Sequence, residues 1–379
     1  TNRTRRVPHP VLIGHAANKV EGSEGYAVLF QGGGAGRVEG NMFADGRRAA
    51  IAVSGGSSPQ VVKNRIESSR ATGVFVFDGG RGAFTQNTVA RCRLAGVEVR
   101  DEGSFCVVEG NTVSDGQDGG IVVHSGARGL VQANMVRDNA MAGITVCTGA
   151  APSVVGNTVL GGDGAGILLH SGAAGAVKGN TVRGVGKAGI EIRRDAHPTL
   201  SGNTIDRCMG QGVLVHKGAR AEVEGNEVSG CQGALIEVAG DAALRAVGNR
   251  LSAGRACGAW LRSRGVCEFR ANSVEGCLQA SVRVEGGAAP EVEDNRLRAG
   301  RAQGILVVGE GTAGIFRGNE VSAHAGAGLE VSEGAAPEFS NNTVASALQG
   351  GGGAGVLVCD RGAGLIEGNT IRGCCPPPP

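Results

Sequence analysis

Two groups of side chains have residue types that carry out chemistry, and both recur at a fixed spacing along the chain. The first group contains two glutamates, an arginine and a histidine, namely Glu191, Arg193, His216 and Glu237. If they lie on stacked parallel strands, about 4.8 Å apart, the two carboxylates are roughly 9.6 Å apart with His216 between them. That separation is close to the upper limit for the carboxyl pair of an inverting glycosidase. This group carries the alternative hypothesis of a polysaccharide-acting lyase, hydrolase or epimerase.

The second group is a thiol between two imidazoles. His124, Cys147 and His170 follow one another at intervals of 23 residues. On stacked strands the thiol would lie about 4.8 Å from each ring, as in a nucleophile with its base or in a metal site. The same column of the sequence offers no fourth ligand and no carboxylate to orient a ring. We therefore predict a solvated strand face at this point, with no metal, no cofactor and no catalytic residue.

Both spacings come from an internal repeat that is marked by asparagine. The marker returns every 23 residues, apart from two intervals of 24 and a last one of 27. A period of this length indicates a solenoid built from stacked coils. The markers are Asn18, Asn41, Asn64, Asn87, Asn111, Asn134, Asn157, Asn180, Asn203, Asn226, Asn249, Asn272, Asn295, Asn319, Asn342 and Asn369.

Three short strands can be predicted in each repeat. Around Asn157 they carry Val154, Val159, and the pair Ile167 and Leu169. Apolar residues alternate with polar ones in each segment, which is the periodicity of a strand. Strands this short are stable only when each coil pairs with its neighbours. The sequence therefore predicts an all-β fold, a single-stranded parallel β-helix of about 16 coils of 23 residues.

The marker has a structural explanation in such a fold. A side-chain amide both donates and accepts, so asparagines stacked in register can bond to one another as an internal ladder from Asn41 to Asn369. We also expect the marker to adopt the left-handed backbone of a tight corner. A glycine nine residues after most markers, as at Gly73 and Gly143, is expected to serve a second corner.

Composition limits the partners and the compartment. The net charge of +2 gives no support for nucleic-acid or membrane binding, and the chain has no apolar run of membrane-spanning length. Of the 11 cysteines, five lie five residues after a marker, which indicates buried, reduced thiols and a cytoplasmic location. Those five are Cys92, Cys208, Cys231, Cys277 and Cys374.

The pattern Gly-Ala-Ala-Pro-x-Val-x-x-Asn-x-Val, followed by Gly-Ile-x-Val, resembles a known repeat family. It is similar to the right-handed parallel β-helix repeats of carbohydrate-binding and sugar-hydrolase type. The 23-residue register is most like the repeats of F-box-only protein 11 and of SHC SH2-domain-binding proteins, and more loosely like NosD-type proteins. The resemblance implies the fold for nearly the whole chain, but it implies no single function, because this fold hosts enzymes, receptors and scaffolds.

One column of the repeat points to binding rather than catalysis. On the outward side of the glycine-started strand, apolar residues occupy every second coil, and long side chains from the coils between them could cover them. We predict from this column a non-enzymatic scaffold or substrate receptor that binds other proteins within a larger assembly, with glycan binding as the alternative. The predicted interaction face consists of Phe75, Val122, Leu168, Leu214, Trp260, Leu306 and Leu357.

The remaining expectations concern boundaries and minor sites. Residues 1–373 are expected to form the β-helix, and residues 374–379 a proline-rich tail or linker to a further segment. The coils are nearly bare, with one four-residue insertion near residues 347–353, whereas enzymes on this scaffold build clefts from long insertions. A threonine column that other residues interrupt argues against ice binding. Aspartates in glycine-rich turns, such as Asp115 and Asp163, are better explained by corner chemistry than by calcium.

Overall fold

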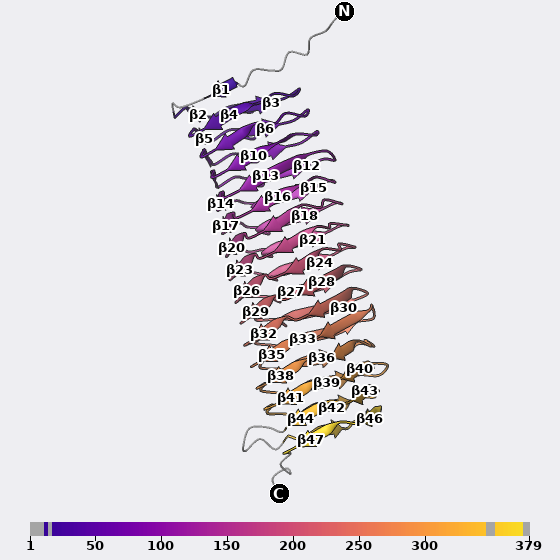
Figure 1. Cartoon of the computed structure of the whole chain (residues 1–379). Helices are drawn as coiled ribbons and strands as arrows, with labels where there is room; N and C mark the ends of the chain where they lie inside the picture. The colour runs from indigo at the N-terminus through magenta and orange to yellow at the C-terminus, as the bar shows by residue number, and fades with distance from the viewer. Residues whose placement is uncertain (1–10, 14–16, 346–352, 374–379) are drawn as a thin grey trace, which may run out of the picture. The chain divides into compact units, whose positions relative to one another are not determined.

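The computed structural model describes residues 11–13, 17–345 and 353–373. It divides the chain into two compact units, residues 1–181 (unit 1) and 182–379 (unit 2). In both units the described residues form short parallel strands and no helix, in three sheets that we name A, B and C (Figure 1). No helix in this part of the chain could therefore cross a membrane. The prediction of an all-β parallel β-helix is confirmed, whereas the proline-rich tail, most of the predicted insertion and Cys374 lie outside the described residues.

Unit 1 contains the first coils of the repeat. Its sheet A contains β1 (Val11–Ile13), β4 (Gly36–Glu39), β7 (Gln60–Val62), β10 (Arg81–Thr85), β13 (Phe105–Glu109), β16 (Arg128–Gln132), β19 (Ser153–Val155) and β22 (Ala176–Lys178). Its sheet B contains β2 (Lys19–Glu21), β5 (Met42–Ala44), β8 (Arg65–Glu67), β11 (Thr88–Ala90), β14 (Thr112–Ser114), β17 (Met135–Arg137) and β20 (Thr158–Leu160). Its sheet C contains β3 (Val28–Phe30), β6 (Ile51–Val53), β9 (Val74–Val76), β12 (Val97–Arg100), β15 (Ile121–His124), β18 (Ile144–Cys147) and β21 (Ile167–His170).

Unit 2 repeats the same three sheets. Its sheet A contains β25 (Thr199–Ser201), β28 (Arg220–Glu224), β31 (Ala243–Val247), β34 (Cys267–Arg270), β37 (Glu291–Glu293), β40 (Ile315–Arg317), β43 (Glu338–Ser340) and β46 (Leu365–Glu367). Its sheet B contains β23 (Thr181–Arg183), which begins at the boundary residue, then β26 (Thr204–Asp206), β29 (Glu227–Ser229), β32 (Arg250–Ser252), β35 (Ser273–Glu275), β38 (Arg296–Arg298), β41 (Glu320–Ser322), β44 (Thr343–Ala345) and β47 (Thr370–Arg372). Its sheet C contains β24 (Ile190–Arg193), β27 (Val213–His216), β30 (Ile236–Gly240), β33 (Ala259–Ser263), β36 (Val282–Val284), β39 (Ile305–Val308), β42 (Leu329–Ser332) and β45 (Val356–Val358).

The asparagine ladder forms as predicted within each unit. At Asn134, Nδ2 donates to Asn157 Oδ1 at 2.9 Å and to the backbone oxygen of Val108 at 2.8 Å. Asn134 Oδ1 accepts from both the backbone nitrogen and Nδ2 of Asn111, at 2.9 and 3.0 Å. The side chain is 1% exposed, and its four bonds satisfy polar groups that water cannot reach.

The residue before the ladder asparagine, not the asparagine itself, takes the left-handed backbone. Lys63, Ala133 and Ala271 have φ of 53°, 52° and 50°, and glycine occupies the same place in many other coils, as at Gly156 (φ 61°). Our expectation for the asparagine was wrong. Its backbone N–H must align with the Oδ1 of the next coil, so the turn is made one residue earlier.

The glycine column at the second corner has a steric cause. A Cβ on Gly143 would lie 2.5 Å from Val159 Cγ1 and 2.9 Å from the backbone oxygen of Gly166. Gly73 meets the same obstruction, from Val89 Cγ1 and the Gly96 oxygen, both at 2.5 Å. Neither has a positive φ. At these positions glycine is present because the next coil approaches too closely for a Cβ, whereas Leu235 and Ser281 occupy the same column in two other coils.

Extra residues are absorbed at a corner and not in a sheet. The interval from Asn87 to Asn111 is one residue longer than the usual coil, yet Thr88 still pairs with Thr112 and Asn87 still donates its N–H to Asn111 Oδ1 at 2.8 Å. The extra residue lies between β12 and β13, at the corner that joins sheet C to sheet A. The register of the sheets is thus independent of the length of that corner.

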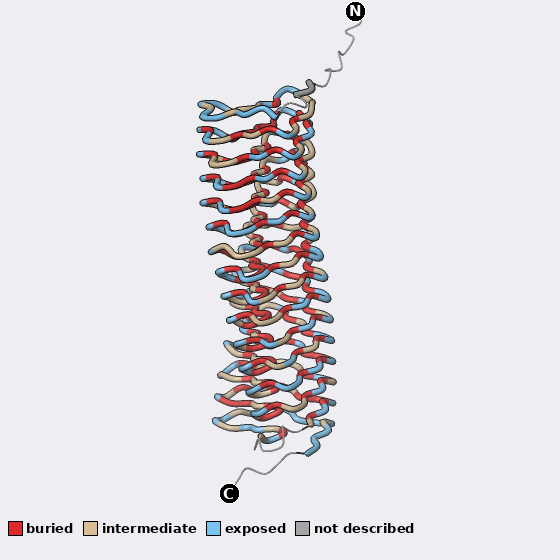
Figure 2. Tube along the Cα trace, turned by 90° about the vertical axis from the view of Figure 1, so that its left-hand side faces the viewer, coloured by how far each residue is buried: buried red, intermediate tan, exposed pale blue. Residues whose placement is uncertain are grey.

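The interior is a stack of aliphatic columns with few aromatic rings. Val89, Val113 and Val136 lie in register on sheet B and are at most 1% exposed. Figure 2 shows buried residues recurring in every coil. Burying each such side chain contributes roughly 1.5–3 kcal/mol relative to leaving it in water. The predicted cysteine column joins this interior, since Cys92, Cys208, Cys231 and Cys277 are all buried.

A histidine replaces cysteine in the same column of unit 2. His324 is 2% exposed, its Nε2 lies 2.9 Å from Ser281 Oγ, and its Nδ1 has no partner among the described residues. Burial lowers the pKa of His324 to about 4, well below its ordinary value of 6.5. The folded chain therefore keeps this ring neutral at pH values where the unfolded chain binds a proton.

We expect this histidine to make unit 2 sensitive to acid. Because the folded pKa is depressed, the stability is full above about pH 6.5 and falls by roughly 3 kcal/mol as the pH is lowered to 4. Urea unfolding of the wild type and of His324→Cys between pH 4 and 7 measures the effect. The variant carries the residue that the column uses elsewhere, so its curve should lack this share of the pH dependence. Equal pH slopes for the two proteins would contradict the assignment.

Candidate functional sites

The first group of sequence-predicted site residues lies on sheet C of unit 2. Glu191 and Glu237 are two strands apart with Leu214 between them in the same row. Glu191 Oε1 lies 3.0 Å from Arg193 Nη1 and 3.1 Å from His216 Nε2. The structure therefore brings together Glu191, Arg193 and His216, as the spacing predicted.

Glu237 belongs to a separate ion pair. It is 1% exposed and is held by Arg262, whose Nε lies 2.8 Å from Oε1, and by Gln211, whose Nε2 lies 2.8 Å from Oε2. An inverting glycosidase needs one carboxyl group that carries a proton and one that reaches a water molecule. Cations engage both glutamates, and protein covers both, so the arrangement supports ion pairing within the sheet rather than acid–base catalysis.

Charged side chains lie over the two aromatic residues of the predicted interaction face. The Arg100 guanidinium carbon lies 4.8 Å from the ring centre of Phe75. Trp260 lies between Arg262 and Arg283, at 4.6 and 5.5 Å. The other five residues of the predicted face are Val122, Leu168, Leu214, Leu306 and Leu357. The first four are half-buried, and Leu357 is 39% exposed. At the two aromatic positions the covering side chains reduce what a partner could contact.

The thiol–imidazole column of unit 1 forms no metal site in the described residues. His124 turns toward Glu98, with Nε2 3.1 Å from Oε1, and toward Ser125, with Nδ1 2.9 Å from Oγ. Burial raises the pKa of the Cys147 thiol, which disfavours the thiolate that a nucleophile or a metal ligand needs. The carboxylate at Glu98 was missed in the sequence because it lies one coil away and two positions earlier in the repeat.

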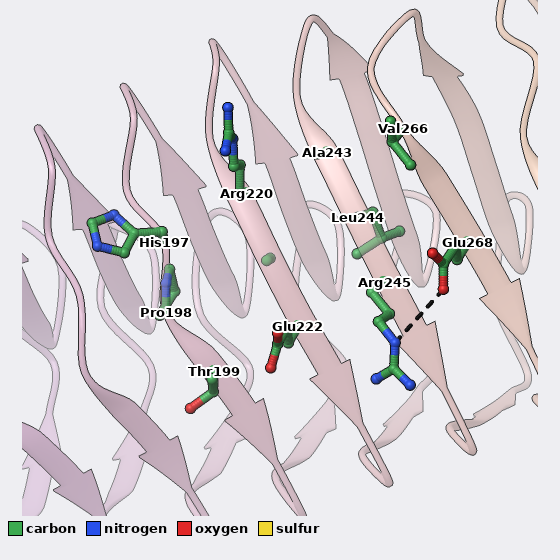
Figure 3. Close-up of a pocket in the computed structure, with 11 residues that line it drawn as sticks. His197, Pro198, Thr199, Arg220, Glu222, Ala243, Leu244, Arg245, Val266 and Glu268 are labelled. Atoms are coloured by element: carbon green, nitrogen blue, oxygen red, sulfur yellow. Dashed lines mark ion pairs between the residues drawn. The ribbon is translucent and has the colours of Figure 1, made fainter.

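A groove lies on sheet A of unit 2, a face for which the sequence predicted no site (Figure 3). It is an open hollow of about 370 Å³ across β25, β28, β31 and β34. The small residue Ala243 creates the hollow, since it lies in register with the much longer Arg220. The polar residues that line it are His197, Thr199, Arg220, Glu222, Arg245 and Glu268, and the apolar ones include Pro198, Leu244 and Val266.

The charges in this groove differ from those on sheet C. Arg245 Nε and Glu268 Oε2 are 3.6 Å apart in a solvent-exposed pair, drawn as a dashed line in Figure 3. Arg220 and Glu222 have no ion-pair partner among the described residues, and Val266 is 74% exposed. The groove therefore offers an exposed apolar side chain beside two charges that are not paired within the described part of the fold. The polar residues that line the groove occupy two positions of the repeat, six and four residues before the marker asparagine, so comparing these two positions along the sequence could have identified them.

The repeats match one family model along most of the chain. The model describes a right-handed β-helix region, and it matches residues 16–159, 147–253 and 234–376. The chain belongs to the right-handed β-helix family. The match is to this broad family, so the narrower resemblance to the repeats of F-box-only protein 11 and to NosD-type proteins stays a prediction.

Several solved structures align with this chain at low sequence identity. The periplasmic alginate epimerase AlgG aligns with a TM-score of 0.52 and 10% identity over 85% of this chain and 78% of its own. Vag8, solved in complex with C1 inhibitor, has a TM-score of 0.49 and 13% identity over 96% and 100%. A GH87 α-1,3-glucanase from Streptomyces thermodiastaticus has a TM-score of 0.45 and 11% identity over 95% and 70%. No curated protein sequence matches this β-helix chain.

Proposed function

We propose that this β-helix is a recognition scaffold that binds an extended segment of a partner protein in the sheet A groove of unit 2. The observation that carries the proposal is the pair of uncommitted charges, Arg220 and Glu222, beside an apolar hollow. On sheet C, by contrast, the charged side chains of Glu191 and Glu237 are already paired within the fold.

The geometry of these charges fits a peptide. Arg220 and Glu222 project from the same face of β28, two residues apart, so they are separated by roughly 6.6 Å along the strand. Side chains on one face of an extended peptide have the same repeat. A segment with an acidic and a basic residue two positions apart can therefore pair with both at once. Recognition would use side chains, since β28 is already hydrogen-bonded to β25 and β31.

A glycan fits this groove less well. Sugar rings usually stack on tryptophan, tyrosine or phenylalanine, and the lining of the groove contains none of them. Alginate is the glycan to compare, because the epimerase AlgG shares the fold. The binding experiment therefore compares two ligands, an extended peptide with alternating charges and a polyuronate.

The binding test uses a fluorescein-labelled peptide of alternating Glu-Thr-Lys-Thr and the whole chain. Reversing one charge with Arg220→Glu removes an exposed ion pair and adds a repulsion, so we expect binding to weaken roughly tenfold. Glu338→Ala is the control, since Glu338 lies in the row of Glu222 on sheet A, outside the groove. Equal affinity for wild type and Arg220→Glu, or saturable binding of oligo-alginate with none of the peptide, would exclude the proposal.

We extend the proposal to the compartment and the assembly. Nine described cysteines are free. Cys208 and Cys231 are among them, although they occupy equivalent positions in adjacent coils, each two residues after a paired strand residue. Such thiols persist in reducing compartments, so we propose a cytoplasmic protein that works as part of a larger protein assembly.

A further inference from the structure

Four side chains in unit 1 form a continuous hydrogen-bonded relay that ends on a serine hydroxyl. Thr72 Oγ1 donates to Glu98 Oε2 at 3.1 Å. Glu98 Oε1 lies 3.1 Å from His124 Nε2, and His124 Nδ1 lies 2.9 Å from Ser125 Oγ. A carboxylate that orients an imidazole, whose other nitrogen contacts a hydroxyl, is the arrangement that activates a serine nucleophile.

We propose that Ser125 is a nucleophile for small carboxylic esters, with His124 as its base and Glu98 as the group that fixes the ring. This activity is separate from partner binding, because it uses residues 72–125 and none of the groove residues. It changes our expectation that the chain has no catalytic residue.

The positions of the three groups follow from the repeat. Glu98 projects from the outer face of β12, and His124 projects from β15, which is paired with β12 in register. Ser125 follows His124 at the corner after β15, where its φ is 54°. Thr148 and Ser171 have the same left-handed backbone at the same corner. The corner therefore fixes the direction of the Cα–Cβ bond of the serine, and this backbone is a property of the fold.

The protonation states suit the role. The pKa of the Glu98 carboxyl is lowered: burial alone would raise it, but the hydrogen bonds from His124 and Thr72 outweigh that effect. An ionised Glu98 accepts from Nε2–H of His124, which leaves Nδ1 with its lone pair toward Ser125. His124 and Glu98 keep 23% and 18% of their side chains exposed, so the relay lies at the surface and a small ester can approach it.

The reaction would proceed by acyl transfer. Ser125 Oγ attacks the ester carbonyl while its proton passes to His124 Nδ1, and Glu98 stabilises the imidazolium. The alcohol leaves with the proton from Nδ1, which gives an acyl-serine. Water then attacks the acyl-serine with His124 as its base, and the acid leaves as Ser125 regains its proton. No oxidant, metal or cofactor enters this balance.

Other coils supply internal controls for this relay. His170 Nδ1 also lies 2.9 Å from a serine, Ser171 Oγ, but the position that corresponds to Glu98 is Thr145. His216 has its carboxylate at Glu191, but the position that corresponds to Ser125 is Lys217. The residue types of Glu98, His124 and Ser125 are therefore not repeated together at the corresponding positions around His170 or His216.

The test is labelling of the folded wild-type chain with a fluorophosphonate, which loses fluoride as a serine Oγ bonds to phosphorus. Peptide mapping by mass spectrometry should find Ser125 labelled at least tenfold faster than Ser171 in the same molecules. Equal labelling of the two serines, or none at Ser125, would overturn the proposal, and this comparison needs no variant to fold.

Variants then separate the roles. Ser125→Ala should abolish both the label and the hydrolysis of p-nitrophenyl acetate, whereas Ser171→Ala should leave both unchanged. Glu98→Gln keeps the shape but cannot stabilise the imidazolium, so both rates should fall at least tenfold, with kcat reduced more than KM is raised. Hydrolysis that persists in Ser125→Ala would also overturn the proposal.

Discussion

Replacing Asn134 by alanine should lower the free energy of unfolding of unit 1 by roughly 3–6 kcal/mol. The substitution removes two donated and two accepted hydrogen bonds in a place that water cannot reach. It leaves two N–H groups of Asn111 without their acceptor and removes the Asn134 donor from the Val108 carbonyl, and each buried group left unpaired costs about 1–3 kcal/mol. Chemical denaturation followed by circular dichroism measures the loss.

The control for this experiment is the first rung of the same ladder. Asn18 is exposed, and among the described residues its side chain donates only to Asn41 Oδ1, at 2.8 Å. Asn18→Ala should therefore cost less than about 1 kcal/mol. Because a solenoid can unfold coil by coil, hydrogen exchange should also show the amides of β14 and β17 opening before those of distant coils in Asn134→Ala. Equal losses for the two variants would mean that the ladder does not stabilise the stack.

Replacing Arg262 by alanine should destabilise unit 2 by roughly 3–5 kcal/mol, because it leaves the Glu237 carboxylate buried without its cation. Arg262 itself is 42% exposed and packs on Trp260, so the loss comes mainly from the stranded carboxylate. Adding Glu237→Gln to Arg262→Ala should restore part of the stability, since a neutral amide is easier to bury than a charge. Urea unfolding of the two single variants and the double variant gives the coupling between the residues.

An exposed ion pair of the same type provides the comparison. Arg296 Nε lies 2.9 Å from Glu320 Oε2, and the two side chains are 54% and 53% exposed. Arg296→Ala should cost no more than about 1 kcal/mol. If Arg262→Ala cost as little as Arg296→Ala, Glu237 would not depend on its cation, and the catalytic hypothesis for Glu237 would regain support.

The fold could be predicted because one residue type recurs where the backbone has no alternative. An asparagine every 23 residues, with an apolar residue two positions later, specifies both the register and the face that is buried. The left-handed φ at the corner was predicted for the ladder asparagine, but it belongs to the residue before it. The two residues are neighbours, and the sequence did not show which of them adopts the left-handed backbone.

The sites were harder to predict because they depend on side-chain direction and size. The pairing of Arg262 with Glu237 spans 25 residues, and nothing in the spacing distinguishes it from a solvated position. The groove exists because Ala243 is short where Arg220 is long, which is a difference in shape along a row. The relay to Ser125 joins a carboxylate to a ring one coil and two columns away, so no single column of the repeat reveals it.

The corner that absorbs an extra residue between β12 and β13 has a consequence for how such chains can change. The same corner also holds the extra residue of the interval from Asn295 to Asn319, and Asn295 still donates its N–H to Asn319 Oδ1 at 3.1 Å. The hydrogen-bonded register between neighbouring coils is therefore kept when a single coil gains a residue at this corner. A loop grafted at this corner should alter what the coil can recognise without disturbing the coils beside it, which makes each repeat a separate site for acquiring new specificity.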